Sequence, residues 1–348
     1  MENGITDKKN AIYSGDSSEY FRIWIINIFL TIVTLGIYSA WAKVINTKYL
    51  YQNINIDGHR LDYIANPVNI FIGRLIATVF LVVFYLVSIF LPIVFYWLML
   101  LVLFFLFPLI INRSLSFQYR MTTYRNVRFN FKGTYIESLW YFLIFPFVIS
   151  IFTIGGTYPL ALKYADEYRI RNTKFGNVPV SPLLSPGPYY GAFGISIAIV
   201  FGAAIVFAIL ISLLLVIFIS AGLSETATFV FTYVNSLFFY ISIIAVTTSV
   251  WAVAIRNHTF NNSVIPNVAK FNSTMKYGAY IKLTIVNVFA VILSIGLATP
   301  WAVTRNLKYL SNTLEVHTEK GVDKVIDDIA DDNSAIMDEV AGAFDIQI

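Results

Sequence analysis

The side chains able to carry catalytic chemistry are few and lie far apart along the chain. The three histidines, His59, His258 and His317, stand in separate polar segments without the spacing of a metal site. The sequence contains no cysteine, so it offers neither disulfides nor thiolate nucleophiles. Ser273 and Lys276 match a Ser-x-x-Lys pattern, but no second motif of that enzyme class follows. We therefore expect no enzymatic activity, no metal ion and no cofactor.

One serine and one histidine provide a weaker enzymatic alternative. Ser196 lies in an apolar run just after Gly194, and with His258 it would supply the nucleophile and base of an intramembrane hydrolase. His258 follows the charged Arg256, however, and is expected outside the bilayer. The intramembrane hydrolase is therefore the least favoured alternative.

Ion-coupled transport is also disfavoured by the residue types. Coupled transporters usually need an ionisable side chain within the membrane to bind and release the driving ion. None is evident here, because Glu225 stands at a hairpin tip and Glu137 at a helix entrance. A passive channel or facilitator for a small molecule remains open, since hydroxyls, amides and carbonyls can line a pore.

Asparagines inside apolar segments are the best candidates for a polar site. Asn27 and Asn287 occupy equivalent places in two copies of a repeat. Their amides either fix helix packing, for about 1 kcal/mol each, or face one central site. The further candidates for that site are Thr31, Thr34 and Asn235. A continuous polar path between the two asparagines would favour a conduit, and a dry centre would favour a structural role.

Small residues mark two other features. A bend or a close approach of the backbone is expected at Gly36, Gly156 and Gly296. A stripe of small residues four positions apart predicts close helix packing. The stripe consists of Gly194, Ala198 and Gly202.

Basic and aromatic residues mark the expected membrane surface. Asn-containing motifs follow each membrane excursion, and in three of them an arginine precedes the asparagine. These pairs are Arg125 with Asn126, Arg171 with Asn172, and Arg256 with Asn257. They either hold anionic lipid headgroups through the planar guanidinium or anchor helices and strands. Trp41 and Trp301 are expected at the same interface. Because no nucleic-acid motif is present, the basic charge is assigned to topology and not to nucleic acid.

The elements that position these residues must lie in a membrane. Hydrophobic residues make up 57% of the chain and charged residues only 13%, and the mean hydropathy is strongly positive. This composition excludes a water-soluble domain. The uncharged run from 75 to 111 is too long for one helix, so Pro92 near its centre predicts a first transmembrane hairpin. Two further uncharged runs meet at Glu225, which predicts the tip of a second hairpin.

Three shorter uncharged segments are copies of one repeat. Nine residue identities recur 260 positions later, including Tyr20 with Tyr280 and Trp41 with Trp301. The middle copy has neither the asparagine nor the tryptophan. The three repeat cores are 23–42, 138–162 and 283–304. Internal repeats of this kind are typical of membrane proteins.

The charge pattern predicts an unusual path for these cores. Both flanks of every core are basic, whereas neither hairpin tip is. Because Lys and Arg beside membrane ends tend to stay cytoplasmic, we expect each core to enter, bend near its Thr-Leu-Gly or Ile-Gly element, and return. The two hairpins would then have to shield the bends, since irregular backbone needs protein cover at that depth. Ordinary spanning cores, giving seven membrane helices, are the alternative.

The polar segments carry short strands and an acidic end. Residues 54–63 predict two strands around an Asp-Gly turn, and 127–133 alternate in the same way. Proline residues between 178 and 188 predict a stiff linker. The tail from Thr318 carries nine acidic residues against two lysines. It either docks on the basic face of its own chain or stays solvated.

The pattern resembles a known family. The repeated Asn-x(8)-Gly followed by Trp-Ala, the Thr-Leu-Gly element at 34–36, and Asn-Thr at 172 and 312 are similar to the YjgN-like family. That family is a domain-of-unknown-function group of bacterial inner-membrane proteins. The likeness covers nearly the whole chain, from about Tyr13 to the tail. It implies a multi-pass location in the bacterial cytoplasmic membrane and brings no activity with it.

We therefore predict an all-α polytopic membrane protein with internal repeats, two transmembrane hairpins, three repeat-core helices that re-enter or span, and small cytoplasmic β-hairpins. The expected segments are a polar N-terminus (1–19), the first repeat (20–66), the first hairpin (67–112), the second repeat (113–180), a linker and second hairpin (181–255), the third repeat (256–317) and an acidic tail (318–348). The predicted role is structural or partner-binding in the envelope. The expected partners are the lipid bilayer with its anionic headgroups and another membrane protein, and the oligomeric state is left open.

Overall fold

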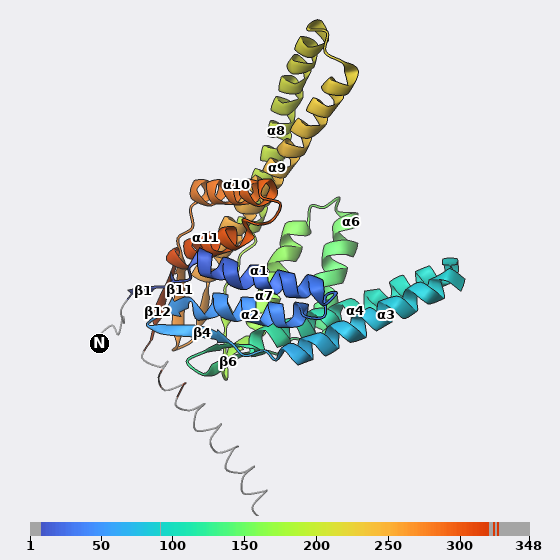
Figure 1. The fold of residues 1–348 in the computed structure, drawn as a ribbon. Helices are drawn as coiled ribbons and strands as arrows, with labels where there is room; N and C mark the ends of the chain where they lie inside the picture. Colours follow the sequence, from blue (N-terminus) through green and yellow to red (C-terminus); the bar gives the residue numbers. More distant parts are fainter. Residues whose placement is uncertain (1–7, 91, 320–322, 324–325, 327–348) are drawn as a thin grey trace, which may run out of the picture.

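The computed structural model describes residues 8–90 and 92–319, together with Asp323 and Ile326. Helices project from a base of short strands, and two long helical hairpins leave that base in different directions (Figure 1). Five described helices are long and apolar enough to cross a membrane, at 67–89, 97–120, 135–152, 187–220 and 225–261. The predicted polytopic membrane fold is confirmed.

Twelve short strands within the described residues form the base. They are β1 (Lys8–Asn10), β2 (Ile12–Tyr13), β3 (Ile54–Ile56), β4 (His59–Tyr63), β5 (Thr122–Tyr124), β6 (Val127–Phe131), β7 (Thr173–Phe175), β8 (Val178–Pro179), β9 (Ser181–Pro182), β10 (Ser263–Ile265), β11 (Ala269–Ser273) and β12 (Leu314–Thr318). One sheet has the order β1-β12-β11-β10-β9 and the other runs from β2 to β8 in chain order. Only Ala11 separates β1 from β2, and only Val180 separates β8 from β9. The chain therefore passes between the sheets at both ends, and we call the closed arrangement the β-ring.

A hydrophobic core joins the two sheets of the β-ring. Its buried residues are Tyr124, Val127, Phe175, Ile265, Val268, Ala269 and Val316. The predicted strand pair around the Asp-Gly turn is confirmed as β3 and β4, and the predicted alternating segment is β6. The proline-rich stretch contributes β8 and β9, so it takes part in the β-ring as well as linking it to the second hairpin.

The two long hairpins have the predicted connections. The first consists of α3 (Pro67–Phe90) and α4 (Pro92–Arg120), and the second of α8 (Gly187–Ser220) and α9 (Glu225–Asn261). Ser224 begins α9 by accepting a hydrogen bond from the amide of Ala227 at 3.2 Å, a typical N-cap. Helix α4 extends past the expected end at residue 112 and continues almost directly into β5.

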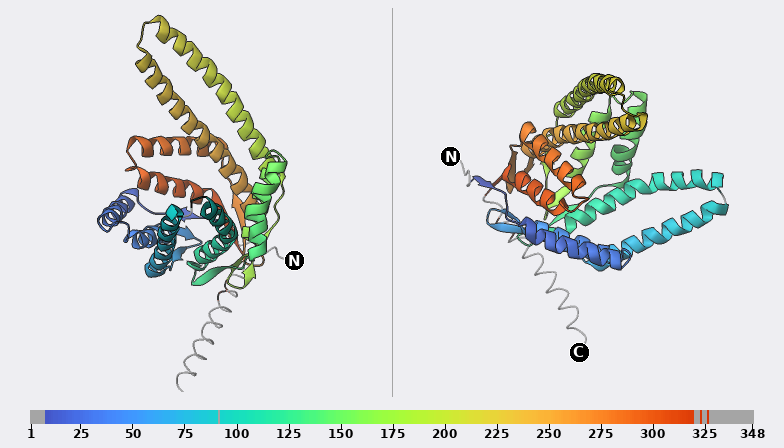
Figure 2. Two further views of the ribbon diagram at one scale, coloured as in Figure 1. Left: turned by 90° about the vertical axis from the view of Figure 1, so that its right-hand side faces the viewer. Right: turned by 45° about the horizontal axis from the view of Figure 1, so that its top comes forward.

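Each repeat core is a helix pair that reverses direction. In the first copy α1 (Ser17–Val33) lies beside α2 (Ser39–Gln52), and in the third α10 (Tyr277–Leu293) lies beside α11 (Thr299–Asn312). In the middle copy α5 (Tyr135–Leu139), η1 (Trp140–Ile149) and α6 (Ser150–Phe152) lead outward and α7 (Tyr158–Arg171) returns. Figure 2 shows α1 beside α2 and α10 beside α11, and the two pairs contact each other through α1 and α11. Both basic flanks of each core thus lie at the β-ring, as the re-entrant interpretation requires.

The middle copy differs because of a proline. Pro146 lies inside η1, which has π-helical hydrogen bonding. Proline has no amide hydrogen and clashes with the carbonyl four residues earlier, so it disfavours the α-helical register. The third copy and the first copy keep a regular α-helix at the corresponding depth.

The three tips of the repeat cores share one backbone turn. At each tip a glycine with positive φ donates its amide hydrogen to the carbonyl five residues earlier. The bonds are Gly36 to Thr31 at 2.8 Å, Gly155 to Ser150 at 2.7 Å and Gly296 to Val291 at 2.8 Å. The left-handed conformation favours glycine because it has no Cβ. In the middle copy the positive φ belongs to Gly155, whereas Gly156 makes the predicted close approach, because a Cβ on it would lie 3.1 Å from the carbonyl oxygen of Thr153.

A hydroxyl completes each turn. Thr34 donates to the carbonyl of Leu30 at 2.7 Å and accepts from the amide of Tyr38 at 3.0 Å. Thr153 and Ser294 accept from the amide four residues later in the same way. The turns therefore satisfy these backbone groups with their own side chains.

The tips are apolar and uncovered. Leu35 is 94% exposed, Ile154 is 97% exposed and Ile295 is 94% exposed. The expectation that the long hairpins shield the bends is wrong, because these residues touch little of the chain. Protein cover is unnecessary where a turn pairs its own amides and carbonyls, since the cost of entering lipid comes from unpaired backbone groups.

The first part of the acidic tail docks on the β-ring. Glu319 pairs with Lys270 at 2.8 Å, and Asp323 pairs with Arg125 at 2.8 Å. Ile326 packs against the core between the sheets. The docking alternative holds for these residues, and the remainder of the tail lies outside the described residues.

Candidate functional site

The two core asparagines are buried, and each one bonds within its own repeat. Asn27 is 3% exposed and donates to Oδ1 of Asn46 at 2.8 Å. Asn287 is 8% exposed, donates to the carbonyl of Ala302 at 3.3 Å and accepts from Arg305 at 3.4 Å. Each amide therefore joins the outward helix of its core to the returning helix. Among the described residues no hydrogen bond connects the two asparagines.

The other predicted polar residues also bond locally. Thr31 donates to the carbonyl of Asn27 at 2.6 Å, and Thr34 serves the tip turn. Asn235 lies on α9 in the second hairpin and donates to the carbonyl of Phe231 at 2.9 Å. The structure thus places Asn235 in a different helical unit from Asn27. Among the described residues, the hydrogen bonds of these side chains do not converge on one site.

The three Arg-Asn pairs occupy unlike positions, so their treatment as equivalent motifs is wrong. Arg125 and Asn126 form the turn between β5 and β6, with φ of 52° and 63°. These two positive φ values are typical of a two-residue hairpin turn. Asn172 caps α7, whereas Arg256 and Asn257 lie inside α9, about one turn before its end.

The feature that does repeat is the passage from helix to strand. Asn53, Asn172 and Asn262 each donate a side-chain hydrogen bond to the carbonyl four residues earlier, at 2.8, 3.0 and 2.8 Å. A strand of the β-ring follows each of them. Asparagine suits this position because its short amide can satisfy a carbonyl left unpaired at the helix end.

Each arginine of the pairs has a protein partner. Arg171 pairs with Glu137 at 3.0 Å, and Arg256 donates to the carbonyl of Leu310 at 2.8 Å. Arg125 pairs with Asp323 in the tail. Beside that turn, burial raises the pKa of Tyr124 to about 12, and the nearby Asp57 carboxylate adds to this shift.

The two tryptophans lie at the start of the returning helices. Trp41 stacks with Tyr38 at a centroid distance of 6.3 Å and contacts Phe71 of α3 at 5.7 Å. The guanidinium of Arg305 lies over the ring of Trp301 at 5.0 Å. Trp41 therefore links the first repeat to the first hairpin, and Trp301 screens the arginine that bonds Asn287.

The small-residue stripe on α8 faces away from the described chain. Gly194, Ala198 and Gly202 are all exposed. A Cβ built on either glycine would meet no atom within 4 Å. The predicted close helix packing is therefore not made within the described chain, and it stays a prediction for a helix of another chain.

The serine and histidine of the hydrolase alternative are not assembled. His258 accepts the amide hydrogen of Ser185 through Nε2 at 2.9 Å, and its Nδ1 lies 3.1 Å from the Asn262 amide. The Ser196 hydroxyl is buried and has no hydrogen-bond partner in the described part of the chain. Both nitrogens of the ring are thus occupied by groups other than the serine.

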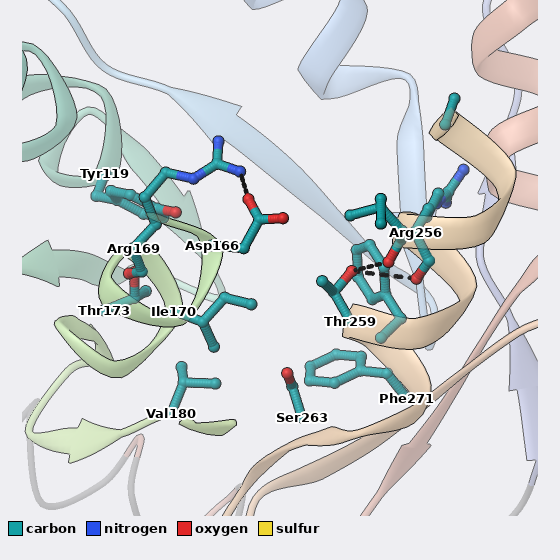
Figure 3. Close-up of a pocket in the computed structure, with 13 residues that line it drawn as sticks. Tyr119, Asp166, Arg169, Ile170, Thr173, Val180, Arg256, Thr259, Ser263 and Phe271 are labelled. Atoms are coloured by element: carbon teal, nitrogen blue, oxygen red, sulfur yellow. Dashed lines mark hydrogen bonds and ion pairs between the residues drawn. The ribbon is translucent and has the colours of Figure 1, made fainter. Parts of the chain in front are cut away.

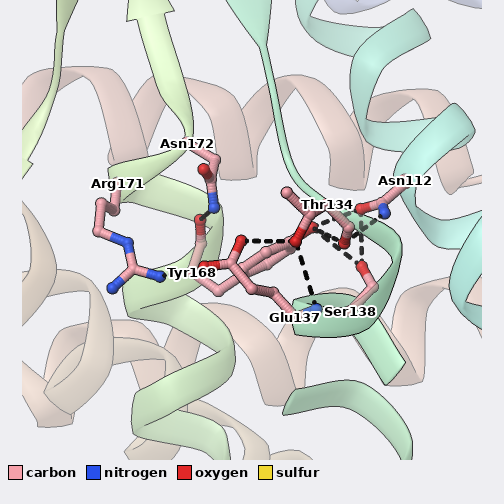
Figure 4. Close-up of polar contacts among 7 residues, drawn as sticks. All are labelled: Asn112, Thr134, Glu137, Ser138, Tyr168, Arg171 and Asn172. Carbon is pink, nitrogen blue, oxygen red and sulfur yellow. Dashed lines mark hydrogen bonds and ion pairs between the residues drawn. The ribbon is translucent and has the colours of Figure 1, made fainter. Parts of the chain in front are cut away.

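A buried polar cluster joins the first hairpin to the middle repeat (Figure 4). The phenol oxygen of Tyr168 lies 2.6 Å from Oδ1 of Asn112 and 3.1 Å from the carbonyl of Thr134. The Ser138 hydroxyl lies 2.6 Å from Oδ1 of Asn112 and 3.0 Å from the same phenol oxygen, and its one hydrogen can serve either bond. Thr134 is the N-cap of α5, since its hydroxyl accepts from the amide of Glu137 at 3.3 Å and donates to the Glu137 carboxylate at 3.0 Å. Because these groups are mutually satisfied, the cluster works as a structural joint.

A cavity of about 440 Å³ lies where α4, α7 and α9 meet the β-ring (Figure 3). Most of its wall is apolar, with side chains such as Ile170, Ile255, Phe260 and Phe271. This volume is in the range of ligand pockets, about 300–1,000 Å³. The cavity is the best candidate for a binding site.

The polar groups of the cavity come from α4, α7, β7, α9 and β10. Asp166 forms an ion pair with Arg169 and accepts from the hydroxyl of Tyr189 at 2.9 Å. Ser263 is 6% exposed, and its hydroxyl has no partner among the described residues. A buried hydroxyl without a partner costs about 1–3 kcal/mol, so it calls for an explanation.

Reasoning from the sequence missed the cavity and the polar cluster. The Thr-x-x-Glu box at Thr134 was a readable signal for the start of α5. Asn112, Asp166 and Ser263 carried no signal, because each is a single polar residue whose neighbours come from distant segments.

Helical hairpins on a β-ring, with five helices that can cross a membrane, define a polytopic membrane protein. The chain belongs to a family described as bacterial protein of unknown function (DUF898), whose model matches residues 9–343. The resemblance to YjgN-like proteins is thereby confirmed, and the protein is a multi-pass protein of the bacterial inner membrane.

Two relatives illustrate the likeness. Inner membrane protein YjgN of Escherichia coli strain K12 is 32% identical over 157 residues, which cover 44% of this chain and 38% of the relative. Inner membrane protein YjgN of Salmonella typhimurium strain LT2 is 28% identical over 163 residues, which cover 43% of this chain and 39% of the relative. The similarity thus spans less than half of either relative. No solved structure matches the chain.

Proposed function

We propose that this protein is a non-enzymatic scaffold of the inner membrane, which holds the β-ring at the cytoplasmic surface and offers its spanning hairpins to another membrane protein. The observation that carries the proposal is that all five helical units leave the β-ring and return to it. The strands that bracket them are β2 and β3, β4 and β5, β6 and β7, β9 and β10, and β11 and β12. The basic flanks of the units therefore share one side, as the positive-inside rule favours.

The polar side chains of α9 support a structural role over a conduit. Nine of them donate to the backbone carbonyl four residues earlier in the helix or at its N-cap. They are Thr228, Thr232, Asn235, Ser236, Ser242, Thr247, Thr248, Ser249 and Thr259. A pore lined by hydroxyls and amides needs those groups to face a permeating solute. Because these donors already bond carbonyls of their own helix, the surface of α9 can lie against lipid or another helix without an unpaired polar hydrogen.

The exposed face of α8 supports a partner-binding role. Small residues let two helices approach closely in a membrane, where packing is a main source of affinity. The stripe at Gly194, Ala198 and Gly202 leaves this face open for a helix of another protein.

Single-cysteine labelling tests the scaffold topology, because the natural chain has no cysteine. We expect Asn177→Cys and Pro266→Cys, in two turns of the β-ring, to react with a membrane-impermeant maleimide only from the cytoplasmic side. Leu223→Cys at the tip of the second hairpin should react only from the opposite side. Leu35→Cys should react from neither side. Reaction of the two β-ring positions from opposite sides would overturn the proposal.

Photo-crosslinking tests the partner role. A benzophenone amino acid at Ala198 on the stripe should give one discrete protein adduct in cells, identifiable by mass spectrometry. Leu214 is the control, because it is exposed on roughly the opposite side of the same helix. The partner should disappear when Gly202→Ile blocks close approach. Lipid adducts alone from Ala198 would argue against a protein partner.

A further inference from the structure

We infer that the cavity between α7, α9 and the β-ring binds the headgroup end of an anionic phospholipid. The inference rests on the proposed membrane placement. The uncharged part of α9 ends at Ile255, and the cavity is lined by the same helix from Ala252 to Phe260. The cavity thus lies at the depth where the helix leaves the hydrocarbon, which is the depth of lipid headgroups.

The unpartnered hydroxyl of Ser263 marks the inner end of this site. Figure 3 shows the Ser263 oxygen directed into the space between α7 and α9. The side chain is more than nine-tenths buried, and its oxygen has no hydrogen-bond partner in the described chain. A phosphate or ester oxygen in the cavity would accept this hydrogen, which would remove the cost of leaving it unpaired.

The charge of the lining favours an anion. The lining contains two arginines, Arg169 and Arg256, and one carboxylate, Asp166. The Arg256 guanidinium donates to the carbonyl of Leu310 at 2.8 Å. That carboxylate already bonds Arg169 and the hydroxyl of Tyr189. The Arg169 side chain is 47% exposed. A guanidinium has five N–H donors, so Arg169 can bind a phosphate while it keeps its carboxylate partner.

The remaining wall favours a lipid over a free anion. Ile170, Ile255, Phe260 and Phe271 offer apolar surface that inorganic phosphate cannot use. The ester-linked glycerol and the first methylene groups of a phospholipid match this combination of one anionic end and one apolar end. The arginines of the three Arg-Asn pairs already bond protein groups, and Arg256 of this lining is one of them. Arg169 is therefore the guanidinium that offers its further donors to the phosphate.

Binding is tested with delipidated protein in detergent, so the result does not depend on which way the chain is inserted. The thermal unfolding midpoint is measured with phosphatidylglycerol, with phosphatidylcholine and with inorganic phosphate. We expect phosphatidylglycerol to raise the midpoint in a saturable manner, phosphatidylcholine to raise it much less, and phosphate alone to leave it unchanged. An equal response to phosphatidylcholine or to phosphate would overturn the assignment of an anionic lipid.

Three variants locate the site, and one variant is the control. Ala252→Phe fills the cavity and should abolish the response, whereas Ala204→Phe on the exposed face of α8 should preserve it. Arg169→Gln should weaken binding about tenfold or more, as expected for loss of a charged hydrogen bond. Ser263→Ala should weaken binding about fivefold and yet raise the midpoint of the lipid-free protein, because it removes an unpaired hydroxyl. If Ala252→Phe does not fold, the site is decided by the two measurements on Ser263→Ala, which are its lipid affinity and its midpoint without lipid. An unchanged lipid response in Ser263→Ala and Arg169→Gln would overturn the site.

Discussion

The joint at Tyr168 provides a quantitative test of the fold. Tyr168→Phe removes only the phenol oxygen, which can donate one hydrogen bond, to Asn112 or Thr134, and accept one from Ser138. Each bond contributes about 0.5–1.5 kcal/mol, so the variant should lose about 2 kcal/mol of unfolding free energy. This is a large share of the roughly 5–15 kcal/mol that stabilises a typical domain. The ring contacts to Phe131 and Phe142, at 5.7 and 5.6 Å, should persist.

The assay is equilibrium unfolding in mixed micelles with increasing SDS, followed by circular dichroism. Tyr141→Phe is the matched control, because Tyr141 packs on Tyr168 at 5.8 Å and its hydroxyl makes no hydrogen bond within the described structure. It should change the unfolding free energy by less than about 0.5 kcal/mol. The double variant with Ser138→Ala should be less destabilised than the sum of the single variants, since both hydroxyls belong to one network around Oδ1 of Asn112. Equal losses for Tyr168→Phe and Tyr141→Phe would refute the assignment of the cluster as a joint.

Three further outcomes concern the tips and the β-ring, and each is measured by the same unfolding titration. Gly36→Ala should lower the unfolding free energy by about 1–2 kcal/mol, because residue 36 has a positive φ. Gly73→Ala in α3, where a Cβ meets open space, should leave it unchanged or raise it. Equal effects of the two substitutions would contradict the proposed turn. Thr34→Val should cost about 1–2 kcal/mol because it leaves the Tyr38 amide unpaired, and Thr31→Val, which loses only a bond to its own helix, should cost less; the reverse order would show that the tip hydroxyl is dispensable. The folded pKa of Tyr124 lies at about 12, above its ordinary value of about 10. Its contribution to stability should therefore be constant below pH 10 and decline between pH 10 and 12, and Tyr124→Phe should make that part of the profile flatter; an identical decline in both proteins would exclude Tyr124 as its source.

Most of the architecture was predictable from local patterns. Charge-free runs located both hairpins, and Pro92 and Glu225 located their connections. The Asp-Gly turn and the alternation after Val127 located strands. These signals are local because hydrophobic length and turn chemistry act within one segment. Basic flanks predicted that each repeat core returns, and the reversed helix pairs agree with that prediction.

The errors arose where a residue's role depends on its neighbours in space. Two glycines are adjacent at the middle tip, and only the hydrogen-bond register of the turn shows that the positive φ belongs to Gly155 and the close approach to Gly156. The Gly194 stripe predicts close helix packing, but no periodicity shows whether the partner helix belongs to the same chain. The three Arg-Asn pairs have the same residue types in the sequence, but the first lies in a hairpin turn, the second at a helix cap and the third inside a helix.

The amino-acid sequence by itself determined that the chain lies in a membrane, that it repeats, and that its basic residues gather at the ends of apolar segments. These properties follow from transfer free energies that each segment carries regardless of its neighbours. Only the tertiary structure decided that the strands close into a ring, that each tip pairs its own backbone, and that Asp166, Arg169 and Ser263 surround one cavity. Closing a ring and assembling a cavity depend on contacts between residues far apart in the chain, and those contacts exist only once the chain has folded.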